Sequence, residues 1–481
     1  MTDASEAEVP AVAEAAAPAY SPGVTAAIER GKVRMAVAAE TRARARHLRF
    51  DTIAIHGLWT AEAALAADGS ISEPIVPTTA QQFASADEME AALAYLAPSW
   101  TYARIANPTV TALEGTLALL EGYGTDLDVS CCATSSGMAA IAMATQPFLV
   151  PAEPGIPAAG AAPNFVASAK CYGGTFMLFA ERYAGERGVA IRWVADPLDL
   201  DSWKHAIDDG TRFVFGELPS NPGLAVFDIA GVARLAHANG LPLIVDSTIA
   251  TPALLRPLAL GADIVVHSLS KAIGGSGLAI GGALLSRPGI QSRVGPPEMA
   301  ADFATWVKLH PFRDHGPALS PQAAHAFLVD VRTLLGRVDR WSRSAMAVAT
   351  WLSRNAKVAA VHYPGLPSDP GHVTAARQMR LVDGDECGDD DRRFGHLLGF
   401  EVAGGGAAAR RFFDGLTLIR RATDLGRIRS VATIPAISTH QQQGEAGRAL
   451  AAIPDSLVRL SIGGEHPADL IADLDAAFAR V

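Results

Sequence analysis

The feature that most constrains the fold is a series of short apolar segments, bounded by Gly, Pro or Asp, that alternate with helical periods over residues 113–285. This alternation is typical of an α/β fold with a mostly parallel sheet. The predicted buried strands are residues 213–218, 243–246 and 264–267. The amphipathic stretch 229–239, which ends before Gly240, predicts a helix between the first two of them. Residues 213–271 are therefore interpreted as two consecutive βαβ crossovers.

Length and charge limit the kinds of partner. The chain has 481 residues, which predicts two or three domains. Its formal net charge of −10 argues against nucleic acid as a main partner. Apolar stretches such as Leu258–Leu285 contain charged residues, so no membrane partner is predicted. The 4 cysteines have neither disulfide-like nor zinc-like spacing, and the sequence therefore predicts a cytoplasmic protein with reduced thiols and no metal site.

Several segments outline the organisation of the chain. Residues 1–48 are Ala-rich, begin acidic and carry arginines later, which predicts an N-terminal extension that is flexible or helical at the surface. A role in oligomer contacts is the alternative. Residues 151–163, rich in Ala, Pro and Gly, predict an inserted loop. A long helix-like segment over residues 317–352 indicates a domain boundary near residues 320–335, and residues 394–481 then mix strands and helices.

Two residues next to predicted strand ends carry the strongest chemical signal. Asp246 ends a predicted strand, and ligands of open α/β sheets lie at the carboxyl ends of strands, so this carboxylate is well placed to meet a cation. Capping of the next helix is the alternative. Lys271 follows the next strand, beside Ser268, Ser270 and the glycine-rich stretch 274–277, which combines an amine nucleophile with phosphate-binding donors. A solvated surface lysine is the alternative.

Three weaker signals lie upstream of Lys271. Residues 136–138, Ser-Gly-Met, open a helix of small residues whose free N–H groups suit a phosphate, although a plain Ser N-cap explains the same pattern. Tyr172 lies in a Tyr-Gly-Gly-Thr turn and suits stacking on a flat heterocycle, or is an ordinary turn tyrosine. Asn221 follows a strand and suits contact with a ring hydroxyl, or simply forms an Asn-Pro turn.

These signals belong to a longer series of segments. They are Tyr-Ala-Arg-Ile-Ala-Asn-Pro-Thr at 102–109, Leu-Glu at 113–114, Leu-Glu-Gly at 120–122, Ser-Gly-Met at 136–138, Tyr-Gly-Gly-Thr at 172–175, Ser-Asn-Pro at 220–222, Val-Asp-Ser-Thr at 245–248, Gly-Ala-Asp-Ile-Val-Val-His-Ser-Leu-Ser-Lys at 261–271, Gly-Pro-Ala-Leu-Ser-Pro at 316–321, Thr-His at 439–440 and Val-Arg-Leu-Ser-Ile-Gly at 458–463. In this order they resemble the cysteine and methionine metabolism family of pyridoxal-phosphate (PLP) enzymes, over about residues 50–481.

The resemblance implies a fold and a division into domains. The expected fold class is α/β, of the aspartate-aminotransferase-like type (fold type I), with a mostly parallel central sheet and a smaller C-terminal α/β domain. The PLP-binding domain would span residues 113–330 and the C-terminal domain residues 331–481. Residues 49–112 would form an N-terminal segment that contributes to a neighbouring subunit.

The resemblance also implies which residues hold the cofactor. Lys271 would bind PLP as an imine and shuttle protons once released, and Asp246 would keep the ring nitrogen protonated. Tyr172 would stack on the ring and Asn221 would contact its phenolic oxygen. The phosphate would be bound by the backbone of Gly137 and Met138 and the hydroxyls of Ser268 and Ser270.

Other matching residues imply subunit contacts and substrate binding. Tyr102 and Arg104 would reach into the site of a neighbouring subunit, so a homodimer or homotetramer with shared active sites is expected. Arg459 would bind the α-carboxylate of an amino-acid substrate, because a guanidinium binds a carboxylate as a fork. Ser430 is a weaker candidate for the same carboxylate, and a surface arginine on an edge strand is the alternative for Arg459.

The motifs at 102–109, 316–321 and 438–440 look most like the O-acetylhomoserine sulfhydrylase branch of the family. There, acetate leaves the γ-carbon and sulfide or a thiol adds, which implies γ-replacement on an O-acylated homoserine and a place in methionine biosynthesis. Departures from the pattern, mainly on the substrate side, are Ser247, Ala272, Ser276, Ile434 and a short segment at 289–316. The alternatives are a β- or γ-lyase, γ-replacement with a non-sulfide nucleophile, and an inactive paralogue that serves as a binding subunit.

Overall fold

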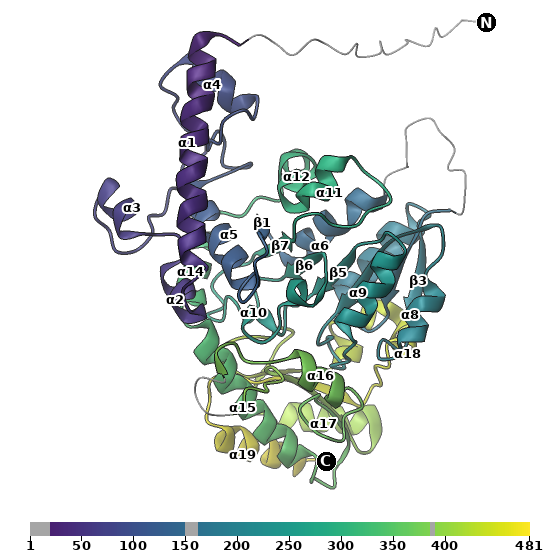
Figure 1. Cartoon of the computed structure of the whole chain (residues 1–481). Coiled ribbons are helices and arrows are strands. Elements are labelled where there is room, and N and C mark those ends of the chain that lie inside the picture. The colour runs from purple at the N-terminus through teal and green to yellow at the C-terminus, as the bar shows by residue number, and fades with distance from the viewer. Residues whose placement is uncertain (1–19, 150–161, 385–389) are drawn as a thin grey trace, which may run out of the picture.

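The computed structural model describes residues 20–149, 162–384 and 390–481 (Figure 1). The predicted loop at 151–163 and the first part of the predicted N-terminal extension lie mostly outside these ranges. Figure 1 shows a larger domain with a central sheet, a smaller domain below it, and a long helix, α1, along one side.

A seven-stranded sheet forms the centre of the larger domain. Its strands in spatial order are β1 (Ser130–Thr134), β7 (Gly282–Ser286), β6 (Ile264–His267), β5 (Leu243–Asp246), β4 (Thr211–Glu217), β2 (Asn164–Ser168) and β3 (Ala190–Val194). Neighbouring strands from β3 to β6 are parallel, whereas β7 runs antiparallel to β6 and β1. Strands β5 and β6 coincide with the predicted segments and β4 differs from its prediction by two residues or fewer at each end, so the mostly parallel sheet is confirmed.

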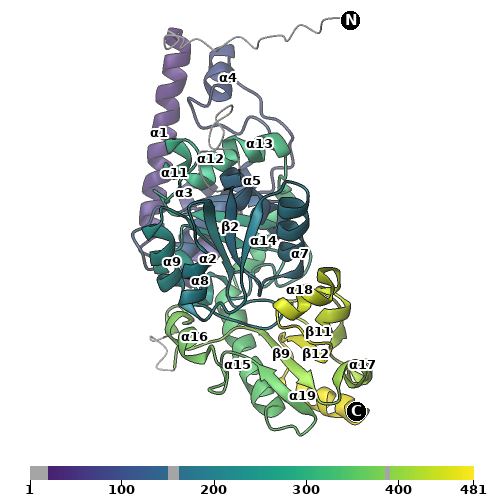
Figure 2. The same ribbon diagram turned by 90° about the vertical axis from the view of Figure 1, so that its right-hand side faces the viewer.

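Both faces of this sheet are covered by helices. On β5, Val245 packs in the cluster that includes α5 (Pro108–Glu121) and α9 (Ile229–Ala238). The adjacent Ile244 packs in the cluster that includes α6 (Gly137–Thr145) and α12 (Phe303–Leu309). Figure 2 shows α8 (Leu200–Ala206) with α9 on one side of β2 and α7 (Gly173–Met177) on the other. Burial on two faces explains why the strands read as continuous apolar runs rather than alternating ones.

The smaller domain is built on a five-stranded, mostly antiparallel sheet. Its strands in spatial order are β10 (Arg420–Arg421), β11 (Val431–Thr433), β12 (Leu457–Ser461), β9 (Leu397–Val402) and β8 (Val358–His362). Helices α15 (Leu334–Leu352), α17 (Gly405–Gly415) and α19 (Pro467–Phe478) pack against it. The rings of Phe400, Phe412 and Phe478 contact one another between the sheet and these helices. The domain therefore has an aromatic core of its own.

The helix-like segment expected after residue 317 is two helices rather than one. Helix α14 (Pro321–Val331) packs on α5 of the larger domain, and α15 packs on α19 of the smaller one. Between them Thr333 has φ −115° and ψ 14°, outside the helical region. Its hydroxyl donates to Asp330 O, and such a local side-chain bond competes with the helical backbone pattern.

The N-terminal part of the described chain is helical. Helix α1 (Pro22–Ala45) is capped by Ser21, whose hydroxyl accepts from Val24 N, and it packs near α4 (Ala86–Leu93). The other helices here are α2 (Phe50–His56) and α3 (Ala61–Ala66); elsewhere lie α10 (Thr251–Leu254), α11 (Pro297–Ala301), α13 (Pro311–His315), α16 (His372–Gln378) and α18 (Gly444–Leu450). Of the predicted extension, residues 22–45 thus adopt the helical alternative. Within the described ranges, no helix combines the length and apolarity that a membrane span requires.

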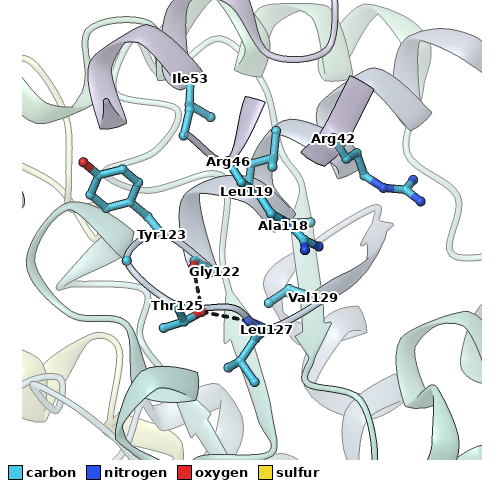
Figure 3. A pocket seen from close by; sticks show the side chains of 11 residues that line it. Arg42, Arg46, Ile53, Ala118, Leu119, Gly122, Tyr123, Thr125, Leu127 and Val129 are labelled. Atoms are coloured by element: carbon cyan, nitrogen blue, oxygen red, sulfur yellow. Dashed lines mark hydrogen bonds between the residues drawn. The ribbon is translucent and has the colours of Figure 1, made fainter. Parts of the chain in front are cut away.

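A small hollow lies under the C-terminal end of α1 (Figure 3). Arg42 of α1, Arg46 just after that helix and Ala118 of α5 line it, and the Thr125 hydroxyl, which donates to Gly122 O, lies below them in this view. Its volume of about 20 Å³ has room for little more than one water molecule. This hollow is too small to hold a substrate.

Candidate active site

A cavity of about 540 Å³ opens at the carboxyl ends of strands β4, β5 and β6, where the smaller domain meets the larger one. Ligands of open α/β sheets bind at this end of the strands. Its lining residues come from both domains and are Ser136, Gly137, Met138, Ile141, Tyr172, Glu217, Asn221, Asp246, Thr248, Ile249, Ser268, Ser270, Lys271, Ile280, Thr423, Asp424, Leu425, Arg427 and Arg459. Most of the residues singled out in the sequence therefore meet in one place.

Lys271 enters this cavity from the loop that follows β6. Its amine donates to Asp424 Oδ1 at 2.9 Å, and its side chain is 28% exposed. The surface-lysine alternative is thus wrong. The expectation that the glycine-rich stretch after Lys271 supplies phosphate donors is also wrong, because a Cβ on Gly274 would meet the Phe327 ring at 2.5 Å and one on Gly275 would meet the Arg337 guanidinium at 2.0 Å. These glycines allow α14 and α15 to approach, and they do not line the cavity.

Two buried carboxylates stand side by side on the floor of the cavity. Asp246 on β5 is paired in parallel register with Glu217 on β4, and each is about 5% exposed. Asp246 Oδ1 accepts from the backbone N–H and the hydroxyl of Thr248, at 3.0 and 2.6 Å. Among the described residues no hydrogen bond reaches Asp246 Oδ2. Burial raises the pKa of Asp246 although the Thr248 bonds oppose it, and a cation at Oδ2 would favour the charged form.

Glu217 was not foreseen from the sequence. Its two oxygens accept from the backbone N–H groups of Tyr172 and Asn221, both at 2.7 Å. Burial raises its pKa well above the ordinary value, and the neighbouring Asp246 charge adds to this effect. Glu217 thus fixes the backbone of two other cavity residues. The rule that singled out Asp246, an acid at the end of a buried strand, applies equally to Glu217 and would have found it.

The start of helix α6 forms another wall of the cavity. Ser136 caps this helix, with its hydroxyl accepting from Ala139 N at 3.1 Å, so the N-cap interpretation is correct. Gly137 and Met138 nevertheless line the cavity, and N–H groups of a first helical turn lack intrahelical partners. A Cβ on Gly137 would lie 2.6 Å from the Cβ of Ser268, so only glycine leaves this corner open.

The two serines near Lys271 differ. Ser268 lines the cavity, and its hydroxyl makes no hydrogen bond with the described residues. The Ser270 hydroxyl instead donates to Gly281 O at 3.1 Å and accepts from Gly281 N at 2.9 Å. Ser268 is therefore free to bind a phosphate, whereas Ser270 already holds the loop that ends in β7.

Tyr172 and Asn221 line the cavity, and the backbone N–H of each binds one oxygen of Glu217. Tyr172 precedes α7, is 37% exposed, and meets the His440 ring edge-on, with centroids 6.4 Å apart. Burial, helped by the charge of Arg459, lowers the pKa of His440 to about 4, so this ring is neutral at ordinary pH. Asn221 Oδ1 accepts from Arg459 Nη1 at 2.9 Å.

Arg459 is buried rather than on the surface. It lies on β12, between β11 and β9, and is 1% exposed, so the edge-strand alternative is wrong. Its Nη1 donates to Asn221 Oδ1 and its Nη2 to Asp424 O, while Nε is buried without a hydrogen bond among the described residues. Burial lowers its pKa to about 10, which leaves the guanidinium charged at neutral pH. A buried cation with a spare donor suits an anionic ligand.

Three sequence candidates lie away from this cavity. Tyr102 is 46% exposed, and the guanidinium of Arg104 donates to Arg313 O and lies over the Tyr102 ring. Neither lines the cavity of its own chain. Ser430 is buried and does not line the cavity; its hydroxyl donates to Glu465 at 2.8 Å and accepts from Gly463 N at 2.8 Å.

Asp424 is the second residue that sequence reasoning missed. It belongs to a loop of the smaller domain and lines the cavity. Burial favours a raised pKa, but the hydrogen bonds from Arg427 and Lys271 outweigh it and hold the pKa of Asp424 below its ordinary value. Asp424 is thus an anion in contact with the amine of Lys271.

These residues together fit a flat, anionic group with a basic ring nitrogen. Free N–H groups and the Ser268 hydroxyl suit its phosphate, and Asp246 Oδ2, which accepts from no described residue and belongs to a side chain that lines the cavity, suits a protonated ring nitrogen. Tyr172 supplies an aromatic face and Lys271 an amine. Within the described ranges, no group of three or more His, Cys, Asp or Glu residues is arranged to hold a metal ion.

Comparisons with known proteins identify a cofactor of this kind, pyridoxal phosphate. The family model for Cys/Met metabolism PLP-dependent enzymes matches residues 51–479. An O-acetyl-L-homoserine sulfhydrylase from Corynebacterium glutamicum is 36% identical over 454 residues, which covers 90% of this chain and 97% of that protein. An L-methionine gamma-lyase from Pseudomonas deceptionensis is 35% identical over 430 residues, covering 89% and 96%. A crystal structure of a putative O-acetylhomoserine (thiol)-lyase from Campylobacter jejuni, which carries an N'-pyridoxyl-lysine-5'-monophosphate, superposes with a TM-score of 0.76 at 32% identity, covering 90% and 100%.

Proposed function

The chain belongs to the Cys/Met metabolism PLP-dependent enzyme family, and on that premise we propose that it catalyses γ-replacement on an O-acylated homoserine. PLP is its cofactor, and its chemistry is that of sulfur amino acid metabolism. In the proposed reaction a sulfide or thiol sulfur forms a bond to the γ-carbon while the bond to the acyl oxygen breaks. O-acetylhomoserine and sulfide would give homocysteine and acetate. A place in methionine biosynthesis and in the cytoplasm belongs to the same proposal.

The observation that carries the proposal is the convergence of Lys271, Asp246 and Arg459 around one cavity. Bound PLP supplies an electron sink for negative charge on the substrate carbons. In the proposal Lys271 binds the cofactor and moves protons, Asp246 faces the ring nitrogen, and Arg459 binds the substrate carboxylate. The buried, charged Arg459 favours a substrate with a carboxylate, and the retained Lys271 and Asp246 argue against an inactive paralogue.

The remaining cavity residues complete the proposed cofactor site. The backbone of Gly137 and Met138 and the Ser268 hydroxyl would bind the phosphate. Tyr172 would stack on the ring, and Asn221 would contact its oxygen through Nδ2, because Oδ1 already accepts from Arg459. Ser270 would act by holding its loop. Ser430 would support the Arg459 region indirectly, since its hydroxyl is occupied by Gly463 and Glu465.

A product assay tests the reaction. The holoenzyme is incubated with O-acetylhomoserine, with and without sulfide, and separately with methionine, and all products are measured by mass spectrometry. We expect homocysteine and acetate only when sulfide is present, with methionine turned over at least about tenfold more slowly, a barrier difference of about 1.4 kcal/mol. A 2-oxo acid and ammonia formed without sulfide would instead support the lyase alternative, which the similarity to L-methionine gamma-lyase keeps open.

We also propose that the active sites are shared between subunits of a homodimer or homotetramer. Tyr102 and Arg104 are exposed and do not line the cavity of their own chain. Large apolar side chains are exposed beside the cavity: Leu278 is 84% exposed, and Ile280, which lines the cavity, is 70% exposed. Exposed apolar groups next to a functional cavity indicate a surface that a partner covers.

Mixing inactive subunits tests this proposal. Lys271→Ala and Arg104→Ala homo-oligomers are each expected to be nearly inactive. After dissociation and reassociation together, half of the dimers are mixed and each contains one intact site, so activity should return to about one quarter of wild type. Size-exclusion chromatography confirms that the subunits have exchanged. Exchange without recovered activity would show that each site is complete within one chain.

A further inference from the structure

The amine of Lys271 is held by a carboxylate from the other domain. Lys271 Nζ donates to Asp424 Oδ1 at 2.9 Å, and Leu425 N donates to the same oxygen at 2.9 Å. The second oxygen, Oδ2, accepts from Arg427 Nε at 2.6 Å. Both oxygens of Asp424 are therefore fixed, and the carboxylate has one orientation toward Lys271.

The loop that carries Asp424 is also fixed against the loop that carries Lys271. Arg427 Nη1 donates to Gly274 O at 3.0 Å, so the residue that holds Asp424 also binds the chain just after Lys271. Gly426 has φ +67°, and a Cβ there would lie 2.5 Å from Ala272 N. Only glycine allows this close approach of the two backbones. The distance between the carboxylate and the amine is thus set by the backbone on both sides.

The inference rests on the proposed role of Lys271. We propose that Asp424 is a positioning residue that binds the Lys271 amine once it is released from the cofactor, and that it stabilises the ammonium formed when this amine takes up a proton. When the neutral amine takes a proton from a substrate carbon, the proton and its positive charge move to Nζ and the electron pair stays on the substrate. A carboxylate at hydrogen-bond distance stabilises this ammonium and keeps it within reach for the return of the proton.

The charges around the amine agree with this role. The titratable groups that line the cavity with Lys271 are Tyr172, Glu217, Asp246, Asp424, Arg427 and Arg459. Arg427 pairs with the second oxygen of Asp424, so the carboxylate is shared between two cations and does not belong to Lys271 alone. The Asp424 side chain is 35% exposed, and solvent screens the pair further. Asp424 can therefore hold the amine without trapping it.

A test that needs no catalysis uses the cofactor-free protein. An acylating reagent reacts with neutral amines only, and its rate at Lys271 is followed by peptide mass spectrometry between about pH 6 and pH 9. In Asp424→Asn, which keeps the shape and removes the charge, we expect labelling at neutral pH to be about tenfold faster, with the pH profile displaced to lower pH. Asp455→Asn, an exposed carboxylate of the same domain, is the control and should behave as wild type.

Kinetics of the holoenzyme give a second readout. We expect Asp424→Asn to lower kcat by about 10- to 100-fold with little change in KM, and Asp424→Glu to recover part of kcat. An unchanged Lys271 labelling profile in Asp424→Asn would overturn the proposal. So would a raised KM at unchanged kcat, which would make Asp424 a substrate contact. The labelling result is independent of which substrate the enzyme uses, so a wrong γ-replacement assignment would leave it intact.

Discussion

Replacing Lys271 by Ala is expected to abolish covalent attachment of PLP and to lower kcat/KM by about 10⁴-fold, the upper end of what a general acid–base residue contributes. The amine of Lys271 lies in the cavity beside Asp424, at the carboxyl end of the parallel sheet. Alanine removes both the cofactor's attachment point and the proton carrier. Borohydride reduction of the holoenzyme followed by peptide mapping should place the cofactor on Lys271 in the wild type and on no residue in the variant.

A matched control distinguishes this effect from a general loss of folding. Lys170 lies two residues before Tyr172 and does not line the cavity, so Lys170→Ala should keep the reduced cofactor on Lys271 and most of the activity. The Lys271→Ala protein should retain its cooperative thermal unfolding, because Lys271 is 28% exposed and is not part of the core. Cofactor found on a different lysine after reduction would refute the assignment, together with every role inferred around it.

The parts of the site predicted from the sequence are those with a local signature. Asp246 and Lys271 follow buried apolar strands, and the strand-end rule of α/β sheets places such residues at one crevice without knowledge of the rest of the chain. Gly137 and Met138 belong to a helix start that Ser136 marks by its capping pattern. For these residues, secondary structure alone determines which way the side chain or the backbone faces.

Asp424 and the contact between Arg459 and Asn221 could not be predicted, because both depend on how the two domains pack together. Asp424 is 153 residues from Lys271 in the sequence, and Arg459 is 238 residues from Asn221, with which it forms a hydrogen bond. Asp424 lies in an irregular loop between short strands, where no periodicity indicates the direction of a side chain. Only close packing of Gly426 on Ala272 brings its carboxylate to the amine. A tertiary contact of this kind leaves no local pattern in the sequence.

Tertiary packing also explains why two predicted serine hydroxyls have partners other than a ligand. Ser270 and Ser430 were assigned to ligands because they match serines of the family that the sequence resembles. Both hydroxyls instead bind nearby backbone, Ser270 at Gly281 and Ser430 at Gly463. A buried hydroxyl is first satisfied by the groups around it, and only the folded structure shows that Ser268 was left free.

The substitution Asp246→Asn is expected to lower kcat strongly, because it removes the charge proposed to face the ring nitrogen. Asparagine has the same shape and its carbonyl oxygen can still accept from Thr248, but it carries no charge, and the amide nitrogen that replaces Oδ2 cannot accept a hydrogen bond from the ring nitrogen. We expect kcat to fall by on the order of 10²- to 10³-fold with a smaller change in KM, the size of loss seen when one preorganised electrostatic contact is removed. Steady-state kinetics with saturating PLP measure both constants.

A cofactor analogue in which carbon replaces the ring nitrogen tests whether Asp246 acts through that nitrogen. With this analogue the wild-type enzyme has already lost the contact, so Asp246→Asn should cause little further loss, and the two changes should be strongly non-additive. The adjacent buried acid provides the control: Glu217 binds the backbone of Tyr172 and Asn221 instead, so Glu217→Gln should weaken binding of both cofactors alike. If Asp246→Asn slows the analogue-loaded enzyme as much as the PLP enzyme, then Asp246 does not serve the ring nitrogen, and the buried pair at the ends of β4 and β5 has only a structural role.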